Sequence, residues 1–196
     1  MNIILKDKKG QTFEYIGDEF GMDEKFEGSK PNYLFKYYPL NKYSIDALSK
    51  NYVYCSWHRD LNDTFDGSPF LLDIDYEIKK LYESNNLGSE KTIGNDFITE
   101  IFSKHGIMCM TENPKDLLMW AYYTSNRGFC LEFDVAKFEN PTKGVYGPFP
   151  INYRDLQEKF KVNKNNLHPI ITATLTTKSA DWQHEKEWRF MYRIPE

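Results

Sequence analysis

The chain has 196 residues and a formal net charge of −4, which fits one domain that can bury a core of its own. No run of Lys and Arg reaches the density of a nucleic-acid-binding patch, so the composition argues against a protein that binds DNA by electrostatic attraction alone. No stretch of about 18 apolar residues is present, and charged residues follow Met1 too closely for a signal peptide. We therefore expect a single cytoplasmic domain over residues 1–196, without membrane contact.

The three cysteines, Cys55, Cys109 and Cys130, form no Cys-x-x-Cys pair, and each lies in an apolar stretch typical of a strand. An odd number of such thiols fits a reducing compartment and favours buried, inert side chains. We predict that all three are reduced and structural.

In the first part of the chain, alternating apolar residues and turn signals predict short strands. A hairpin is expected over 1–16, followed by a loop over 17–31. Strands are expected over 33–37 and 52–56, and Ser44 is the expected N-cap of a short helix between them.

The middle of the chain changes to helical spacing. Residues 57–70 are rich in Asn, Asp, Gly and Pro and predict a loop. Apolar residues three and four apart predict two amphipathic helices, over 74–82 and 97–102, with Gly106 as the stop signal. A strand is expected over 107–111.

A third helix has the clearest start signal in the sequence. Asn113 is the expected N-cap, Pro114 takes the first helical position, and Asp116 lies in the first turn. The helix is expected to end before Gly128, and the alternation over 129–135 predicts a strand.

The last third of the chain is expected to be loop-rich over 139–169, with one charged helical stretch over 154–160. Strands are expected over 170–176, which is β-branched, and over 187–194, which alternates. Because strands and helices follow one another without a βαβ rhythm, we predict an α+β fold with a mainly antiparallel sheet and flanking helices.

The first candidate functional motif is Asn62-Asp63-Thr64-Phe65-Asp66. These residues are either ordinary turn formers or a loop in which Asn62 and Asp63 face a ligand. Asp63 and Asp66, three residues apart, form a weak metal pair, and without a third ligand we expect no metal.

The second motif is Met119-Trp120-Ala121-Tyr122-Tyr123 on the predicted third helix. Such stripes usually belong to the core. Trp120 and Tyr123 are three residues apart, however, so one ring can stack on a base or a nicotinamide while the hydroxyl binds it.

The third motif contains Glu185, Glu187 and Arg189, which fall on one side of the last strand if that strand begins two residues early. Trp188 and Phe190 then face the core. Either the carboxylates and the guanidinium form a structural ion pair, or one carboxylate is catalytic and Arg189 orients it.

Together with Lys36-Tyr37 and with Lys178 ahead of Trp182, these motifs resemble a widespread bacterial and phage family of uncharacterised domains, over about residues 32–193. Residues 1–31 form an N-terminal extension to that core. The chain departs from the family at Thr64, where Pro is usual, and at Tyr122, where His is usual. The order of the motifs also resembles that of ADP-ribosyltransferases.

The second resemblance implies an NAD-using transferase or glycohydrolase with NAD as a substrate. Glu187 would be the catalytic carboxylate, with Glu185 as the second candidate and Arg189 as the orienting partner. The residues expected to bind the nucleotide are Lys36, Tyr37, Asn62, Asp63, Trp120 and Tyr123. A protein or nucleic-acid acceptor is expected, because such enzymes often act as toxins or in phage defence.

Two alternatives stay open. In a non-catalytic binding or regulatory module, the same motifs would only stabilise the fold. In a metal-dependent nuclease, Asp63, Asp66 and Glu187 would meet around a metal ion. The enzyme hypothesis predicts one cleft lined by residues from distant segments: Lys36, Asn62, Asp63, Tyr123, Glu187 and Arg189.

Overall fold

The computed structural model describes residues 4–6, 30–74, 102–138, 145–155, 159–162 and 172–193. At its centre lies a five-stranded sheet in which every neighbouring pair of strands is antiparallel. In spatial order its strands are β6 (Gly128–Asp134), β2 (Tyr33–Pro39), β5 (His105–Thr111), β11 (Glu187–Arg193) and β7 (Val145–Pro150). The predicted α+β class with an antiparallel core is therefore confirmed.

One face of this sheet carries the hydrophobic core. Trp188 and Phe190 of β11 lie opposite Met110 and Met108 of β5, and Leu34 of β2 belongs to the same cluster. Because side chains alternate along a strand, Glu187 and Arg189 must face the other side of the sheet. The alternation predicted for the last strand is confirmed.

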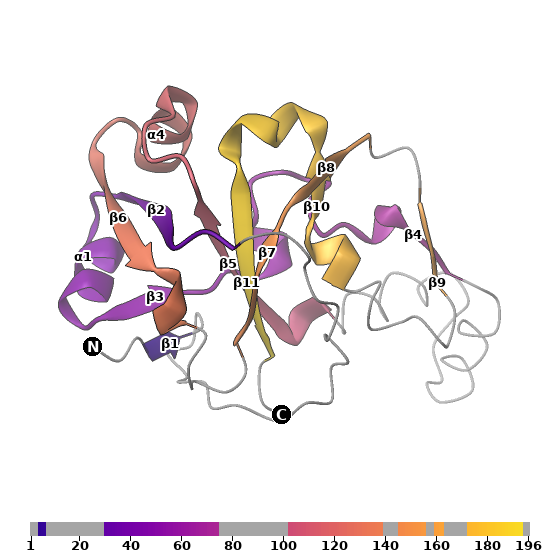
Figure 1. Ribbon diagram of the computed structural model, residues 1–196, viewed down its shortest axis with the longest axis horizontal. Helices are drawn as coiled ribbons and strands as arrows, with labels where there is room; N and C mark the ends of the chain where they lie inside the picture. Colours follow the sequence, from indigo (N-terminus) through magenta and orange to yellow (C-terminus); the bar gives the residue numbers. More distant parts are fainter. Residues whose placement is uncertain are drawn as a thin grey trace.

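Smaller elements flank the sheet on both sides (Figure 1). At the β6 end lie α1 (Lys42–Ser49), α4 (Leu117–Thr124) and the parallel pair β1 (Ile4–Lys6) and β3 (Tyr52–Tyr54). Beyond β7 lie two more parallel pairs, β8 (Asn152–Arg154) with β10 (Thr177–Ser179), and β4 (Leu72–Ile74) with β9 (Phe160–Val162). The 3₁₀ turns are η1 (His58–Asp60), η2 (Pro69–Leu71), η3 (Val135–Lys137) and η4 (Ala180–Glu185).

The helices α1 and α4 each begin at a different residue from the one predicted. Asn41 caps α1, because its side chain accepts hydrogen bonds from the backbone N–H groups of Tyr43 and Ser44. Asp116 caps α4 in the same way, whereas Asn113 forms a turn with the N–H of Lys115. The predicted caps Ser44 and Asn113 were wrong because several residues in each segment can cap a helix, and the packing of the helix selects one.

Two expected boundaries were also wrong. Gly106 does not end a helix but lies inside β5 opposite Tyr192, whose ring fills the space that a side chain would need. Ile74 ends β4 instead of beginning a helix, because its strand finds a partner in β9.

In the last third of the chain, strands lie where a helix was predicted, and a helical turn lies where a strand was predicted. Arg154 ends β8 and Phe160 begins β9, where a helical stretch was expected. Residues 172–175 are helical instead of extended, and the N–H of Thr176 donates to the carbonyl oxygen of Thr172. Burial of Leu175 outweighs the strand preference of the β-branched residues in this segment.

Several predictions fall on residues outside the described part of the chain. These are the return strand of the N-terminal hairpin, the loop that follows it, and nearly all of the two helices expected between residues 74 and 102. Among the described residues, no helix is long and apolar enough to cross a membrane.

Candidate functional site

A charge cluster lies on the face of the sheet opposite the hydrophobic core. We define it by five side chains: Asp66, Lys178, Glu185, Glu187 and Arg189. All five are at most 4% exposed, and they come from two distant segments of the chain. Three carboxylates and two cations are thus buried together. Burying charged groups costs folding free energy unless every group is paired.

Arg189 is the centre of this cluster and is fully buried. Its Nη1 and Nη2 donate to the two carboxylate oxygens of Asp66, at 2.6 and 2.5 Å. Its Nε and Nη2 donate to the two oxygens of Glu187, at 2.7 and 3.1 Å. A fifth bond, from Nη1 to the carbonyl oxygen of Leu175, measures 2.7 Å. Such paired, planar contacts suit a guanidinium better than an ammonium.

Lys178 links this pair of carboxylates to the third one. Its Nζ donates to Glu185 Oε2 at 2.5 Å and to Glu187 Oε2 at 3.0 Å, and it lies 3.9 Å from Asp66 Oδ2. Lys178 belongs to β10, whereas Glu185 ends η4 and Glu187 begins β11.

A left-handed residue lets Glu185 and Glu187 reach the same ammonium group. Lys186 has a φ of 45°, a conformation that few residues other than glycine adopt. It connects the 3₁₀ turn to the strand, so the two carboxylates share one side although β11 begins only at Glu187. Glu185 and Glu187 therefore lie on the same side, as expected, but a turn places them there instead of a longer strand.

One arm of hydrogen bonds runs from the cluster to the protein surface. The Tyr123 hydroxyl donates to Glu185 Oε1 at 2.6 Å, and Asn62 Nδ2 donates to the same hydroxyl at 3.1 Å. Asn62 is exposed, and Tyr123 is half-buried. Glu185 is therefore the carboxylate of the cluster that a hydrogen-bond chain connects to solvent.

The three carboxylates have different pKa shifts. Burial would raise the pKa of Glu187, but the charges of Arg189 and Lys178 outweigh it and lower that pKa to about 2. At Asp66 and at Glu185, burial outweighs the neighbouring cations, and the pKa is raised. Glu187 is thus held as an anion, whereas ionised Glu185 is disfavoured by its surroundings.

The depressed pKa of Glu187 predicts a pH dependence of stability. A carboxyl group whose pKa is lower in the folded state contributes stability above its ordinary pKa of 4.5, and that contribution is lost as the pH falls toward 2. We expect the difference in unfolding free energy between wild type and Glu187→Gln to be largest at neutral pH and to shrink over this interval. Urea unfolding at several pH values measures it. Glu185→Gln is the control, because its raised pKa predicts the opposite slope. A difference for Glu187→Gln that does not change with pH would contradict the prediction.

A small cavity of about 60 Å³ borders the cluster. It is lined by Glu185 and Glu187, by Tyr123 of α4, and by residues of β2 and β5 that include Lys36, Tyr37 and Cys109. Pockets that hold a drug-sized ligand span about 300–1,000 Å³. The small cavity therefore has room for a reacting group but not for a whole nucleotide.

The structure brings most of the predicted site residues together, but not all. Asn62, Tyr123, Glu185, Glu187 and Arg189 belong to one hydrogen-bonded network. Two further predicted residues, Lys36 and Tyr37, only border the small cavity. The Lys36 ammonium donates to the carbonyl oxygen of Cys109, and the Tyr37 hydroxyl donates to that of Asn113.

Two predicted residues lie apart from the network. Trp120 packs edge-on against the ring of Tyr37, and its Nε1 donates to the carbonyl oxygen of Pro114. Asp63 accepts the N–H of Phe65 in a tight turn and lines a different, larger cavity. The nuclease hypothesis requires Asp63, Asp66 and Glu187 to bind one metal ion. Asp66 and Glu187 instead both bind Arg189. Among the described residues, no group of three His, Cys, Asp or Glu side chains is placed to hold a metal ion.

Three residues of the site were not among the predicted catalytic or nucleotide-binding residues. Asp66 and Lys178 stand inside the motifs, and only their long-range pairing reveals their role. Tyr153, whose hydroxyl accepts the N–H of Glu187 at 2.7 Å, gave no signal, because its segment was expected to be loop and helix.

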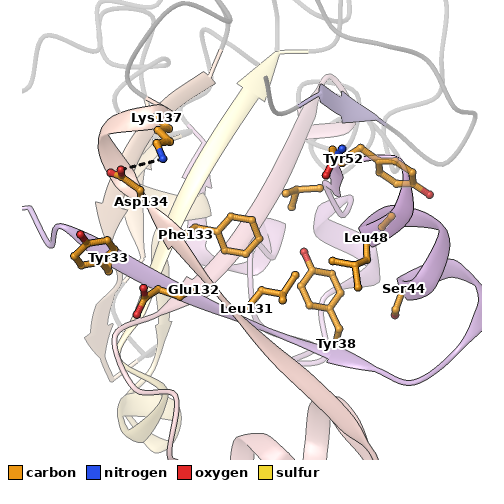
Figure 2. Close-up of a pocket in the computed structure, with 13 residues that line it drawn as sticks. Tyr33, Tyr38, Ser44, Leu48, Tyr52, Leu131, Glu132, Phe133, Asp134 and Lys137 are labelled. Atoms are coloured by element: carbon orange, nitrogen blue, oxygen red, sulfur yellow. Dashed lines mark ion pairs between the residues drawn. The ribbon is translucent and has the colours of Figure 1, made fainter. Parts of the chain in front are cut away.

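Two larger cavities are lined by none of the five side chains of the charge cluster. One, of about 460 Å³, lies between α1, β3 and the strands β2 and β6, and Figure 2 shows it with Tyr38, Leu131 and Phe133 along its wall. An ion pair between Lys137 and Asp134 lies at its edge. None of the predicted site residues lines it. The other, of about 760 Å³, is lined by Asp63, Phe65, Phe70, Leu71, Arg154, Asp155, Lys159, Ser179, Ala180, Asp181 and Trp182.

The three cysteines are free thiols. Burial raises the pKa of Cys55 to about 12 and that of Cys130 to about 11. Cys109 is the thiol nearest the site, where it contacts the carboxylate of Glu187 and lines the small cavity. That the thiols are reduced and structural stays a prediction.

Residues 119–190 match a family described as "Protein of unknown function (DUF2971)". The match covers less than half of the chain, and it contains Tyr123, Lys178, Glu185, Glu187 and Arg189 but neither Asn62 nor Asp66. The expected resemblance to an uncharacterised domain family is confirmed in this form, and the resemblance to ADP-ribosyltransferases stays a prediction. No curated protein and no solved structure matches the chain.

Proposed function

We propose that this protein is an enzyme that cleaves the nicotinamide–ribose bond of NAD and passes the ADP-ribose part to water or to a protein or nucleic-acid acceptor. The observation that carries the proposal is the charge cluster with its arm to the surface. Side chains from residues 62–66, 123 and 178–189 converge on one buried network that contains one more carboxylate than cations.

A purely structural role does not account well for this composition. Buried ion pairs are often no more stabilising than apolar residues of the same size. The excess carboxylate adds a further cost, and the raised pKa of Glu185 reflects it. Polar groups that are expensive to bury and lie beside a cavity are typical of functional sites.

The geometry favours Glu185 over Glu187 as the catalytic carboxylate. Arg189 holds both oxygens of Glu187, so that side chain serves to position Arg189 and Lys178. Glu185 Oε1 accepts one hydrogen bond, from Tyr123, and lies at the end of the chain that reaches the exposed Asn62. Burial raises the pKa of Tyr123, so its hydroxyl stays protonated and keeps donating.

In the proposed reaction the C–N bond between ribose and nicotinamide breaks, and its electron pair leaves with neutral nicotinamide. Positive charge develops on the ribose ring, where the carboxylate of Glu185 stabilises it. Water or a nucleophile of the acceptor then forms the new bond to the ribose carbon and loses one proton.

The test is to incubate the wild-type protein with NAD and to follow nicotinamide and ADP-ribose by chromatography, with and without protein and nucleic-acid acceptors. We expect nicotinamide release together with ADP-ribose or an ADP-ribosylated acceptor. A wild-type protein that releases no nicotinamide with either class of acceptor would contradict the proposal and favour the non-catalytic binding module.

A further inference from the structure

The cavity of about 760 Å³, here called the large cavity, lies next to the charge cluster. The pair β8 and β10 separates the two. In this pair Tyr153 and Lys178 are register partners, and both point toward the cluster. Their neighbours Arg154 and Ser179 are also register partners and line the large cavity. Because side chains alternate along both strands, one face of the pair β8 and β10 borders the charge cluster and the other borders the large cavity.

Trp182 connects the two sites more directly. Its ring lines the large cavity, and the Lys178 ammonium lies 4.8 Å from the centroid of that ring. On the other segment, Asn62 binds Tyr123 in the arm of the cluster, and the next residue, Asp63, lines the large cavity. A ligand in the large cavity would thus have one end beside the arm that leads to Glu185.

The lining of the large cavity has three chemical parts. Phe65 and Phe70 both line the cavity and are 53% and 69% exposed, which is high for large apolar rings. Arg154 and Lys159 supply positive charge. The carboxylates of Asp63, Asp155 and Asp181 complete the lining, and Asp63 Oδ2 is buried without a hydrogen-bond partner among the described residues.

These three parts match the three parts of a nucleotide. Exposed aromatic rings stack on a base, cations bind phosphates, and carboxylates accept hydrogen bonds from ribose hydroxyls. The volume lies within the range of about 300–1,000 Å³ that ligand pockets occupy. The cavity in Figure 2 also has aromatic rings and carboxylates, but Lys137 is the one cation among its described lining residues, and it is paired with Asp134. It therefore offers less positive charge than the large cavity.

We propose that the large cavity binds the ADP-ribose part of a dinucleotide. The base stacks on Phe65 and Phe70, Arg154 and Lys159 bind the phosphates, and the ribose hydroxyls donate to Asp63. The small cavity beside Glu185 then receives the group to be released. This inference names the substrate-binding site and rests on the proposed function, but binding can be measured without any turnover.

The probe is ADP-ribose, and its binding to the whole protein is measured by isothermal titration calorimetry. Phe70→Ala and Arg154→Gln should each weaken binding about tenfold, because each removes a stacking surface or a charge contact. Matched controls in the other cavity are Tyr33→Ala, an exposed ring like Phe70, and Lys137→Gln, an exposed cation. Both controls should bind ADP-ribose as wild type does.

The outcomes separate this inference from the proposed function. If ADP-ribose binds and the two large-cavity variants weaken it, the site is supported even when no NAD is consumed. If ADP-ribose fails to bind wild type, or if the controls weaken binding as much as the large-cavity variants do, the site is wrong even when NAD is consumed. Circular dichroism of each variant shows whether the fold is intact, and Phe70 is exposed enough that its loss should leave the fold unchanged.

Discussion

Replacing Arg189 with Met is expected to lower the free energy of unfolding by about 3–5 kcal/mol, the largest stability effect that we predict for any single residue of the site. The guanidinium makes five hydrogen bonds, four of them to the carboxylates of Asp66 and Glu187. Without it, both buried anions lose their main partner, and Lys178 remains as the only cation of the cluster. Methionine keeps much of the apolar stem, so the loss reports on the charge more than on packing.

Urea unfolding of wild type and variant at pH 7 measures this effect. The matched control is Arg127→Met, because Arg127 is an exposed arginine and such surface substitutions usually change stability by less than about 0.5 kcal/mol. Combining Arg189→Met with Asp66→Asn removes one of the stranded anions and should cost less than the sum of the two single substitutions. A loss below about 1 kcal/mol for Arg189→Met would show that the cluster is not buried in solution as it is here.

Replacing Glu185 with Gln is expected to reduce the rate of NAD cleavage by about 10²-fold or more, because it removes the charge that stabilises the developing positive charge on ribose. The same change should leave stability nearly unaltered. It takes the cluster from three carboxylates and two cations to two of each, and it removes one buried charge that desolvation disfavours. The amide oxygen accepts one of the two hydrogen bonds that Tyr123 and Lys178 donate to Glu185, and Lys178 keeps its bond to Glu187.

Turnover and unfolding measured together distinguish Glu185 from Glu187. Glu187→Gln is expected to lower stability at neutral pH, because Glu187 is held as an anion by Arg189 and Lys178. Glu132→Gln, in an exposed residue of β6, controls for the general effect of replacing a carboxylate. If Glu185→Gln turns over NAD as fast as wild type while Glu187→Gln is inactive and well folded, the catalytic role belongs to Glu187.

The secondary structure of the long and regular elements could be predicted from the sequence pattern alone. The strands around residues 33–37, 107–111, 129–135 and 187–194 were predicted from alternating or short apolar segments between turn signals. The strand expected over 52–56 was predicted for the same sheet, but β3 pairs with β1 outside it. The sides taken by Glu187 and Arg189 followed from the same alternation.

The secondary structure of the short and ambiguous segments depends on tertiary packing. Residues 172–175 are helical despite their β-branched composition, and Arg154 and Phe160 each lie in a strand despite the charged pattern around them. Elements of three or four residues have too few local interactions to specify their own conformation, so the partner strand or the packing around Leu175 decides.

The same division holds for the site. The sequence singled out Asn62, Tyr123, Glu185, Glu187 and Arg189 by residue type and spacing, but it left open whether they formed an ion pair or a catalytic group. It gave no way to learn that Arg189 binds Asp66, 123 residues away, or that Trp120 turns from the cluster to Tyr37. Pairing between residues so distant leaves no periodic trace in one sequence, because it depends on how the strands are ordered in the sheet. The order β6-β2-β5-β11-β7 therefore decided which of the predicted polar residues meet.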